Sequence, residues 1–366
     1  MVSTKRHKGK IVVAMSGGVD SSTVAAMLHE ENYEVIGVTL QLYDVGEMAL
    51  KTKACCAGQD IYDAKNAADI IGIPHYVLNY ENLFSQKVIE DFVDSYVAGE
   101  TPIPCVKCNQ KVKFEDLYKM AKDLGAKALA TGHYVRKERA NGEDMLLKGV
   151  DANKDQSYFL FATTKEQLNF LEFPLGGLVK EETRALAIKY GLNVANKAES
   201  QDICFVPNGN YSEVIRKLRP QSYQPGNIVS KDGIVLGHHD GIVNFTVGQR
   251  KGIGIAHKTP LYVIQIDAKN NQVVVGEKDD LKSARLKIKE VNWLAQDADL
   301  QKEFRCSVRL RSNHEEINAT VKYLGNGYAD VTLDSFYYGI TPGQACVMYD
   351  GDRVLGGGWI MKNSME

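Results

Sequence analysis

The sequence predicts an α/β fold in which an N-terminal parallel-sheet domain is followed by a small β-rich domain and a C-terminal β-barrel. Three observations predict it. Apolar runs alternate with helical stretches up to about residue 131, as in a parallel sheet with crossover helices. Beyond Pro207 helical periodicity becomes rare, and short β-like runs with frequent glycines take over. From about Leu286 more strands follow at short spacing and end at residues 354–360, as in a closed or nearly closed barrel.

The elements of the N-terminal domain follow from local patterns. The first strand is the apolar run 11–15, and an alanine-rich helix begins after Ser22. Further strands are expected at 35–40, 75–78 and 127–131, and helices at 60–72, 83–98, 110–124, 164–171 and 180–190. Later β-like runs are expected at 227–229, 241–246, 261–264 and 272–275. We place the domains at 1–208, 209–281 and 282–366.

Composition narrows the class of protein. The chain has 366 residues, a quarter of them charged, and a net charge of −2, so any site for nucleic acid must be a local basic patch. No apolar run approaches the length of a membrane span, and we therefore expect a cytoplasmic protein without a membrane partner. Seven cysteines, an odd number, do not indicate a disulfide framework, which leaves buried, catalytic or metal-binding roles.

A small-residue turn joins the first strand to the first helix. In Ser16–Ser22 two glycines permit close backbone approach, while three serines and the first helical amides supply hydrogen-bond donors. No Gly-Lys-Ser/Thr follows, so this is not a Walker A loop, and the dinucleotide spacing of glycines is also missing. The pattern predicts an anion cradle rather than an ordinary capped turn. Beside bound phosphates, Asp20 is suited to orient Mg²⁺.

Three cysteines are candidates for a catalytic, redox or ligand role. Cys105 and Cys108 form a CxxC pair after two prolines, and this pair alone is compatible with half a zinc site, a redox pair, a catalytic thiol or cluster ligands. A second CxxC is missing, so zinc is weakly supported. Lys107 and a helix start nearby would favour a thiolate. Cys204 lies between apolar neighbours and, taken alone, suits a buried structural thiol.

The order of the motifs resembles one family. The turn Ser-Gly-Gly-Val-Asp-Ser-Ser is similar to the PP-loop of the ATP pyrophosphatases, which implies an adenine nucleotide alpha-hydrolase-like domain. Taken with the later motifs, the chain resembles the tRNA-specific 2-thiouridylases, the MnmA family, from about Val12 to Gln344. Those motifs are Thr-Pro-x-Pro-Cys-x-x-Cys-Asn (101–109), Gly-His-Tyr (132–134), the run 147–158, Ser-Gln-Asp-Ile-Cys-Phe-Val (200–206) and the glycine-flanked Gln-Arg-Lys loop (245–254).

The resemblance implies an activity and its residues. ATP, with Mg²⁺, would adenylylate O2 of the wobble uridine in tRNAs for lysine, glutamate and glutamine, and a persulfide sulfur would then displace AMP. The sulfur would come from a cysteine desulfurase or a sulfur-relay protein. In the family pattern Cys108 is the nucleophile and Cys204 carries the persulfide. Implied nucleotide contacts are Ala14, Met15, Ser16, Gly17, Gly18, Val19, Asp20, Ser21, Ser22, Leu40 and Gly132. Expected tRNA contacts are Ile103, Pro104, Cys105, His133, Lys154, Asp155, Gln156, Gln249, Arg250, Lys251, Arg309, Arg311 and Gln344.

Two departures from the family pattern leave alternatives open. Ile103 stands where the family usually has Asn, which removes one polar contact near the base. Cys105, Cys108 and Cys204 together are also a possible ligand set for a [4Fe–4S] cluster that would bind sulfide in place of a persulfide. Rival functions are another PP-loop ligase acting on a small molecule and a catalytically idle tRNA-binding or sulfur-relay protein. The three cysteines disfavour the first rival, and the intact PP-loop disfavours the second.

Overall fold

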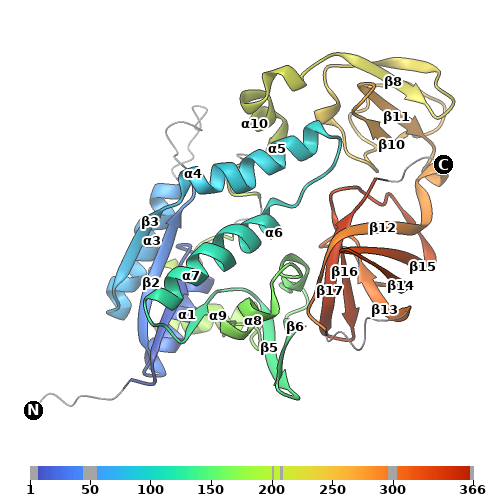
Figure 1. Ribbon diagram of the computed structural model, residues 1–366. Coiled ribbons are helices and arrows are strands. Elements are labelled where there is room, and N and C mark those ends of the chain that lie inside the picture. Colours follow the sequence, from blue (N-terminus) through green and yellow to red (C-terminus); the bar gives the residue numbers. More distant parts are fainter. Residues whose placement is uncertain (1–6, 44–55, 200–201, 207–208, 296–302, 363–366) are drawn as a thin grey trace, which may run out of the picture. The chain divides into compact units, whose positions relative to one another are not determined.

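The computed structural model describes residues 7–43, 56–199, 202–206, 209–295 and 303–362 (Figure 1). The chain divides into two compact units. The first consists of residues 1–88, 106–201 and 352–354, and the second of residues 89–105, 202–351 and 355–366. None of the described helices is both long and apolar enough to cross a membrane.

The first unit is built on a parallel five-stranded sheet with strand order β3-β2-β1-β4-β7. Its strands are β1 (Lys10–Ala14), β2 (Glu34–Gln41), β3 (His75–Asn79), β4 (Ala128–Ala130) and β7 (Leu171–Glu172). β1 lies at the centre and is apolar and buried, because it has a strand on each side and helices over the sheet.

Helices connect and cover these strands. They are α1 (Val19–Glu30), α3 (Cys56–Ile71), α4 (Glu81–Phe84), η1 (Ser85–Ile89), η2 (Asn109–Leu117), α7 (Tyr118–Asp123), η3 (Ser157–Phe159), α8 (Lys165–Phe170), α9 (Lys180–Lys189) and η4 (Asn193–Asn196). α6 (Pro104–Cys108) leads into η2. A hairpin of β5 (Val135–Ala140) and β6 (Glu143–Lys148) follows β4.

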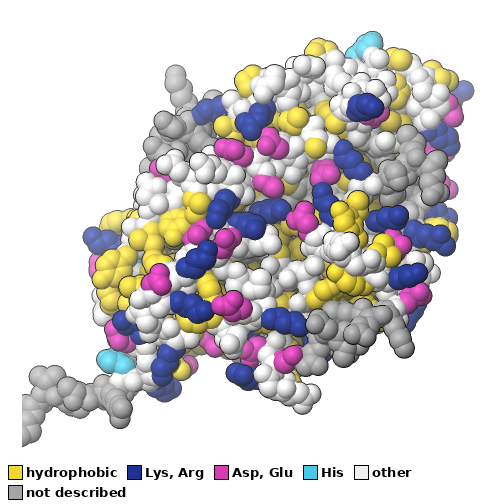
Figure 2. All heavy atoms as spheres, viewed as in Figure 1, with side chains coloured by type: hydrophobic (Ala, Val, Ile, Leu, Met, Phe, Trp, Pro, Cys, Tyr) yellow, Lys and Arg dark blue, Asp and Glu magenta, His cyan; other side chains and the backbone are white. Residues whose placement is uncertain are grey.

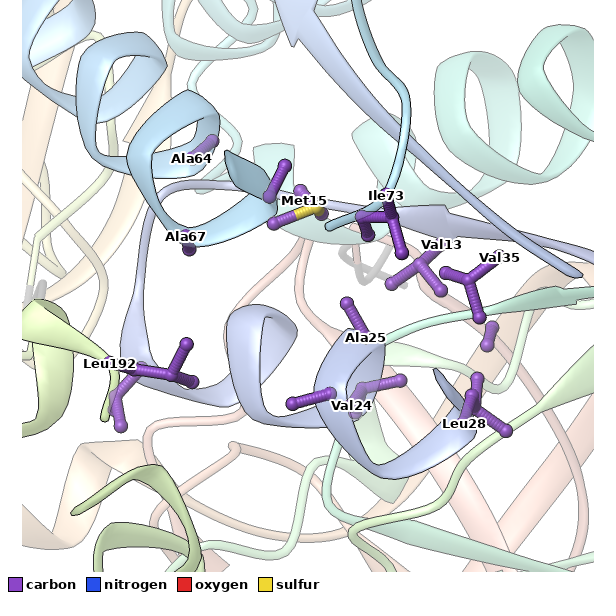
Figure 3. Packing of buried hydrophobic residues seen from close by; sticks show 14 of the residues in the cluster. Val13, Met15, Val24, Ala25, Leu28, Val35, Ala64, Ala67, Ile73 and Leu192 are labelled. Atoms are coloured by element: carbon purple, nitrogen blue, oxygen red, sulfur yellow. The ribbon is translucent and has the colours of Figure 1, made fainter. Parts of the chain in front are cut away.

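The core of the first unit lies between β1 and α1. Val13 and Met15 meet Val24, Ala25 and Leu28 of the helix in one buried cluster (Figure 3). Small residues on α1 let the helix approach the sheet closely, and α3 and α9 pack against α1. The start of α1 is therefore held firmly at the end of β1.

The second unit contains a small sheet, a barrel and helices. α5 (Glu90–Val97) and α10 (Tyr211–Leu218) pack together through the stacked rings of Tyr96 and Tyr211, whose centroids are 4.7 Å apart. The small sheet has the order β10-β11-β8-β9, with β8 (Gly226–Ser230), β9 (Val235–His239), β10 (Tyr262–Asp267) and β11 (Gln272–Gly276). Short helices η6 (Pro220–Ser222), η7 (Ile242–Asn244) and η8 (Lys278–Leu281) complete this part.

The barrel follows the small sheet. Its strands are β12 (Lys282–Trp293), β13 (Phe304–Arg309), β14 (Ile317–Gly325), β15 (Tyr328–Tyr338), β16 (Ala345–Asp350) and β17 (Arg353–Ile360). Their order is β12-β15-β14-β13-β16-β17, and antiparallel pairing of β12 with β17 closes the barrel. A separate buried cluster, which includes Ile288, Val308 and Met348, fills it.

The predicted fold class is confirmed: a parallel α/β sheet, a β-rich middle part and a closed barrel are all present. The expected strand at 241–246 is wrong, because Ile242–Asn244 form a short helix whose apolar side chains are buried. The long helix expected at 110–124 is present, but its first part is the π-helix η2. Helix α10 and strands β5 and β9 have no counterpart among the expected elements.

Candidate nucleotide site and thiol segments

The turn between β1 and α1 forms an anion cradle. Gly17 has a φ of +73°, and a Cβ there would lie 2.0 Å from the Asp60 carbonyl oxygen, so only glycine fits. No side chain caps α1 at Gly18, which leaves the first helical amides facing the turn. Ser21 Oγ accepts a hydrogen bond from the Ser16 amide at 3.0 Å and thereby sets the shape of the turn. Val19 and Ser22 are buried under the turn.

A cavity of about 270 Å³ opens on this cradle. Gly132, after β4, approaches α1 so closely that a Cβ would lie 2.9 Å from the Ser21 amide nitrogen. Six of the implied nucleotide contacts besides Gly132 line the cavity, as do two residues expected to contact tRNA, His133 and Gln156. The lining residues are Ala14, Met15, Ser16, Asp20, Ser21, Val38, Leu40, Leu42, Lys113, Leu117, Thr131, Gly132, His133 and Gln156.

His133 is a neutral group in this cavity. Burial, and to a smaller extent the Lys113 ammonium, lowers the pKa of the His133 imidazole to about 3. Its Nδ1 lies 2.8 Å from Thr131 Oγ1, and the rings of His133 and Phe114 are T-shaped with centroids 6.0 Å apart. A neutral imidazole at the wall of the cavity is suited to hydrogen-bond an uncharged group, such as a base or a ribose.

Asp20 is held from behind the cradle by a buried lysine. Lys180, in the first turn of α9, places its Nζ 2.7 and 2.9 Å from the two Asp20 carboxylate oxygens. The Tyr134 hydroxyl lies 2.8 Å from Asp20 Oδ1 and donates to it, and it also lies 3.0 Å from Thr183 Oγ1. Burial raises the pKa of Tyr134, so the hydroxyl keeps its proton. The negative charge of Asp20 in the cradle is thus neutralised by Lys180.

Lys154, Asp155 and Gln156, which are expected to contact tRNA, belong to a run, 149–157, whose side chains make internal contacts in the first unit. Asp155 accepts hydrogen bonds from the amides of Gly149 and Ser157 and closes its own loop. The Asp151 carboxylate accepts from the amide of Lys180 at 3.1 Å and caps α9. Gln156 Oε1 accepts from the Tyr134 amide at 2.9 Å.

Lys154, in the same run, pairs with Glu199. Its Nζ lies 2.7 Å from Glu199 Oε2. Hydrogen bonds from Lys154 and Lys180 lower the pKa of the Glu199 carboxyl to about 2.

The CxxC pair lies on the short helix α6, where Cys105 is exposed and Cys108 is buried. Next to Cys108, Asn109 Nδ2 donates to the Phe159 carbonyl at 3.3 Å, and Asn109 Oδ1 accepts from Lys113 Nζ at 3.1 Å. Since Lys113 lines the cavity, its hydrogen bond to Asn109 connects the Cys108 end of η2 to this cavity. π-Helical turns of this kind are frequent at functional sites.

The segment before Cys105 is fixed within the second unit. Gln344 Nε2 donates to the Thr101 carbonyl at 2.9 Å, and the Thr101 amide donates to the Pro342 carbonyl at 2.8 Å. Ile103 and Pro104, which are expected to contact tRNA, are buried in this structure. Cys204, also in the second unit, is exposed, which does not fit the buried structural thiol that its apolar neighbours suggest. Phe205 packs edge-on against Phe92.

The expected basic contacts divide into two groups. Arg250 and Lys251 are exposed, and the loop is shaped by Gln249, whose Oε1 accepts from the Thr246 amide at 3.0 Å. Arg309 pairs instead with Glu316 at 3.0 Å, with its side chain only 14% exposed.

Arg311 is likewise engaged inside the second unit. It donates to Thr341 Oγ1 at 2.6 Å and to the Val247 carbonyl at 3.3 Å. On the face shown in Figure 2, Lys and Arg side chains are interspersed with Asp and Glu.

The remaining candidates are Cys55, Cys56, the two cysteines of the barrel and possible metal ligands, and the two barrel cysteines are protonated thiols. Burial raises the pKa of Cys306 to about 12 and also raises that of Cys346, so both stay thiols in the barrel. Cys55 and the Cys56 side chain lie outside the described residues. Among the described residues, no group of three or more His, Cys, Asp or Glu side chains is placed to hold a metal ion.

Sequence reasoning missed several residues around the cradle. Lys180, Glu199, Lys113 and Thr131 come from four separate segments and meet only in the folded chain. Tyr134 donates to Asp20 and belongs to the Gly-His-Tyr motif. That motif is the local signal in the sequence that could have marked Tyr134 as a site residue.

The comparisons with known proteins agree with this arrangement. Family models described as "tRNA methyl transferase HUP domain", "tRNA methyl transferase PRC-barrel domain" and "Aminomethyltransferase beta-barrel domain" match residues 9–208, 212–277 and 283–360.

The tRNA-specific 2-thiouridylase MnmA of Rickettsia canadensis is 56% identical over 99% of both chains. That of Rickettsia massiliae is 55% identical, again over 99% of both. That of Rickettsia prowazekii is 56% identical over 96% of this chain and 99% of its own. The resemblance expected from the motifs is confirmed: the chain belongs to the tRNA-specific 2-thiouridylase (MnmA) family.

Proposed function

We propose that the protein catalyses ATP-dependent 2-thiolation of the wobble uridine of tRNAs for lysine, glutamate and glutamine. The observation that carries the proposal is the nucleotide cradle at β1 and α1, in a chain that also holds Cys108 and Cys204 at the family positions. The tRNA substrate and the sulfur chemistry come from the names of the relatives and from the motif match. The ATP step is supported by the shape and donors of the cradle.

Adenylylation is the first step of the proposed reaction. O2 of uridine attacks the α-phosphorus of ATP, pyrophosphate leaves, and the carbonyl oxygen becomes part of a good leaving group. The free amides at the start of α1 and the backbone at Gly17 are suited to the phosphates. Lys180 offsets the charge of Asp20, which would otherwise repel them. His133, neutral at physiological pH, offers a hydrogen bond in the same cavity.

Sulfur transfer is the second step. The terminal sulfur of a Cys204 persulfide attacks C2 of the uridine, and AMP leaves with the former O2. The Cys108 thiolate then attacks Cys204 Sγ, which releases 2-thiouridine and leaves a Cys108–Cys204 disulfide. An external thiol reductant must open this disulfide before the next turnover. The persulfide comes from a cysteine desulfurase, either directly or through a relay protein.

Metal chemistry has a limited place in this proposal. Both oxygens of Asp20 already accept from Lys180, so we propose that Mg²⁺ arrives with the ATP phosphates and takes at most one ligand from this carboxylate. We assign no step to a [4Fe–4S] cluster on Cys105, Cys108 and Cys204.

Arg250 and Lys251 are exposed, and we propose that both contact tRNA phosphates. Arg309 and Arg311 are engaged inside the second unit, and they contribute to tRNA binding chiefly by shaping the barrel and its loops. We propose that the reaction takes place in the cytoplasm, because tRNA is the substrate and free thiols need a reducing environment.

One experiment tests the function against its rivals. Unmodified tRNA for glutamate is incubated with the protein, ATP, Mg²⁺, a cysteine desulfurase and cysteine, and the nucleosides are analysed by mass spectrometry. The proposal expects 2-thiouridine and AMP in equal amounts. The family models carry descriptions of methyl transfer, so a parallel reaction contains S-adenosylmethionine without ATP. A methylated nucleoside there, or no 2-thiouridine in the first reaction, would contradict the proposal.

A further inference from the structure

Lys113 places a positive charge in the wall of the nucleotide cavity. Its side chain is half-buried and lines the cavity opposite no carboxylate partner of its own: among the described residues its hydrogen bond goes to the neutral Asn109 Oδ1, at 3.1 Å. Two of its three N–H donors are therefore available to a ligand. The charge already acts inside the cavity, because after burial it is the second cause that lowers the pKa of His133.

Two other lysines lie beside the cradle, but both are paired with carboxylates. Lys180 Nζ lies 2.7 and 2.9 Å from the two Asp20 oxygens, and Lys197 Nζ lies 2.7 Å from Asp60 Oδ1. Neither of these lysines lines the cavity. Of the described residues that line it, Asp20 and Lys113 carry a formal charge at neutral pH, and Lys180 offsets that of Asp20. Lys113 thus leaves the cavity with an uncompensated positive charge, which suits an anion.

The helical segment that carries Lys113 begins next to Cys108. α6 ends at Cys108 and η2 begins at Asn109, so Lys113 follows about one helical turn later. Asn109 is 4% exposed and donates to the Phe159 carbonyl at 3.3 Å, which fixes its side chain and the ammonium bonded to it. The Lys113 charge is therefore held at a defined place in the wall.

The proposed reaction brings the ATP α-phosphate to this side of the cavity. Once uridine O2 is adenylylated, a single oxygen atom separates C2 of the base from the α-phosphorus. Because the Cys108 thiolate acts next to C2, the α-phosphate must come near the segment that begins at Cys108. The cradle at the start of α1 remains for the pyrophosphate part of ATP.

We propose that Lys113 is a catalytic residue of the adenylylation step and that its ammonium binds a non-bridging oxygen of the ATP α-phosphate. This role rests on the proposed ATP-dependent thiolation. The bond between uridine O2 and the α-phosphorus forms while the bond to pyrophosphate breaks. Pyrophosphate leaves with the electron pair, and the uridine N3 proton passes to solvent. A fixed cation at the α-phosphate stabilises the charge on its oxygens in the transition state.

The test measures adenylylation alone, without a sulfur donor. The protein, in excess over unmodified tRNA for glutamate, is mixed with ATP and Mg²⁺, and tRNA-dependent release of pyrophosphate is followed in a single turnover. We expect Lys113→Met to slow this release about 100-fold or more, as loss of a transition-state donor does. Binding of α,β-methylene-ATP, measured by equilibrium dialysis, should weaken less than about tenfold, because the contact is strongest in the transition state.

ATP with sulfur in place of one non-bridging α-phosphate oxygen locates the contact at this phosphate. Each diastereomer is compared with ATP in the wild type and in Lys113→Met. We expect one diastereomer to slow the wild type at least about fivefold more than it slows the variant, because the two changes remove the same contact. If Lys113 only held Asn109 in place, the effect of sulfur would be the same in both proteins.

Two further variants separate the role of the charge from a general effect on folding. Lys113→Arg keeps a cation in the cavity wall and should restore part of the rate. Lys119→Met removes an exposed lysine from α7, where it pairs with Glu115 at 3.5 Å, and should behave like the wild type. Circular dichroism shows which variants are folded, and Lys113→Gln serves if Lys113→Met is not.

The outcomes are distinguishable. If the wild type releases pyrophosphate and folded Lys113→Met does so at the same rate, or if the effect of sulfur is equal in both, the role of Lys113 is overturned and the proposed function stands. If the wild type releases no pyrophosphate in the presence of tRNA, the proposed ATP-dependent function itself fails, and the role of Lys113 fails with it.

Discussion

The Glu199 carboxylate makes a measurable contribution to stability that depends on pH. Two lysines lower its pKa from the ordinary 4.5 to about 2 in the folded chain, and its side chain is 23% exposed. A depression of that size corresponds to about 3 kcal/mol of stability at neutral pH. Because the folded-state pKa is the lower one, this stability is present above about pH 4.5 and is lost as the pH falls toward 2. At pH 3.5 about 1.5 kcal/mol of it has gone.

Glu199→Gln removes the titration while keeping the shape of the side chain. The free energy of opening of the first unit is best followed by hydrogen exchange of peptides from β1, since both tryptophans, Trp293 and Trp359, belong to the second unit. The wild type should exceed Glu199→Gln in opening free energy at pH 7, and this difference should shrink by about 1.5 kcal/mol at pH 3.5.

Glu166→Gln is the matched control for this measurement. Glu166 also accepts from a lysine, Lys122 at 3.0 Å, but its side chain is 74% exposed, so solvent screens the pair. We expect a difference from the wild type close to zero at both pH values. A difference for Glu199→Gln that does not change between pH 7 and pH 3.5 would refute the reasoning about the two lysines.

Three more predictions concern the site. Gly132→Val should raise the KM for ATP more than tenfold, because the Cβ of the new side chain would meet the Ser21 amide. Circular dichroism should be unchanged. An unchanged KM would show that Gly132 does not belong to the site. Cys204→Ser should abolish 2-thiouridine but leave tRNA-dependent AMP formation, and loss of both would argue against the division into two steps. Arg250→Ala should reduce the slope of log binding constant against log salt for tRNA by about one, measured by filter binding. An unaltered slope would rule out a phosphate contact at Arg250.

Local patterns made the first half of the fold predictable. β1, its glycine turn and α1 are adjacent in the sequence, and burial on both faces of β1 requires the continuous apolar run that marks it. The run 242–244 shows the limit of such patterns. Its apolar residues pack into the core from a short helix, and periodicity cannot separate a short buried strand from a short buried helix.

The candidate site was predictable only where it is local. The cradle residues Ser16, Asp20 and Ser21 belong to one short turn of the chain, and all three line the cavity. The partners of Asp20 could not be predicted from this turn. Lys180 is 160 residues away in the chain and resembles any other lysine in a first helical turn. Arg309 is a strand arginine that is expected to contact phosphate, and its side chain is largely buried beside Glu316. Ion pairing of this kind depends on which strands become neighbours.

In the proposed reaction, ATP activates O2 of the wobble uridine and sulfur then replaces this oxygen. The most direct test uses tRNA whose wobble uridine carries ¹⁸O at C2, incubated with the protein, ATP, Mg²⁺, a cysteine desulfurase and cysteine. Mass spectrometry then measures 2-thiouridine and the isotope content of AMP. We expect one ¹⁸O in AMP for each 2-thiouridine formed. Formation of 2-thiouridine with AMP that contains no ¹⁸O would contradict it.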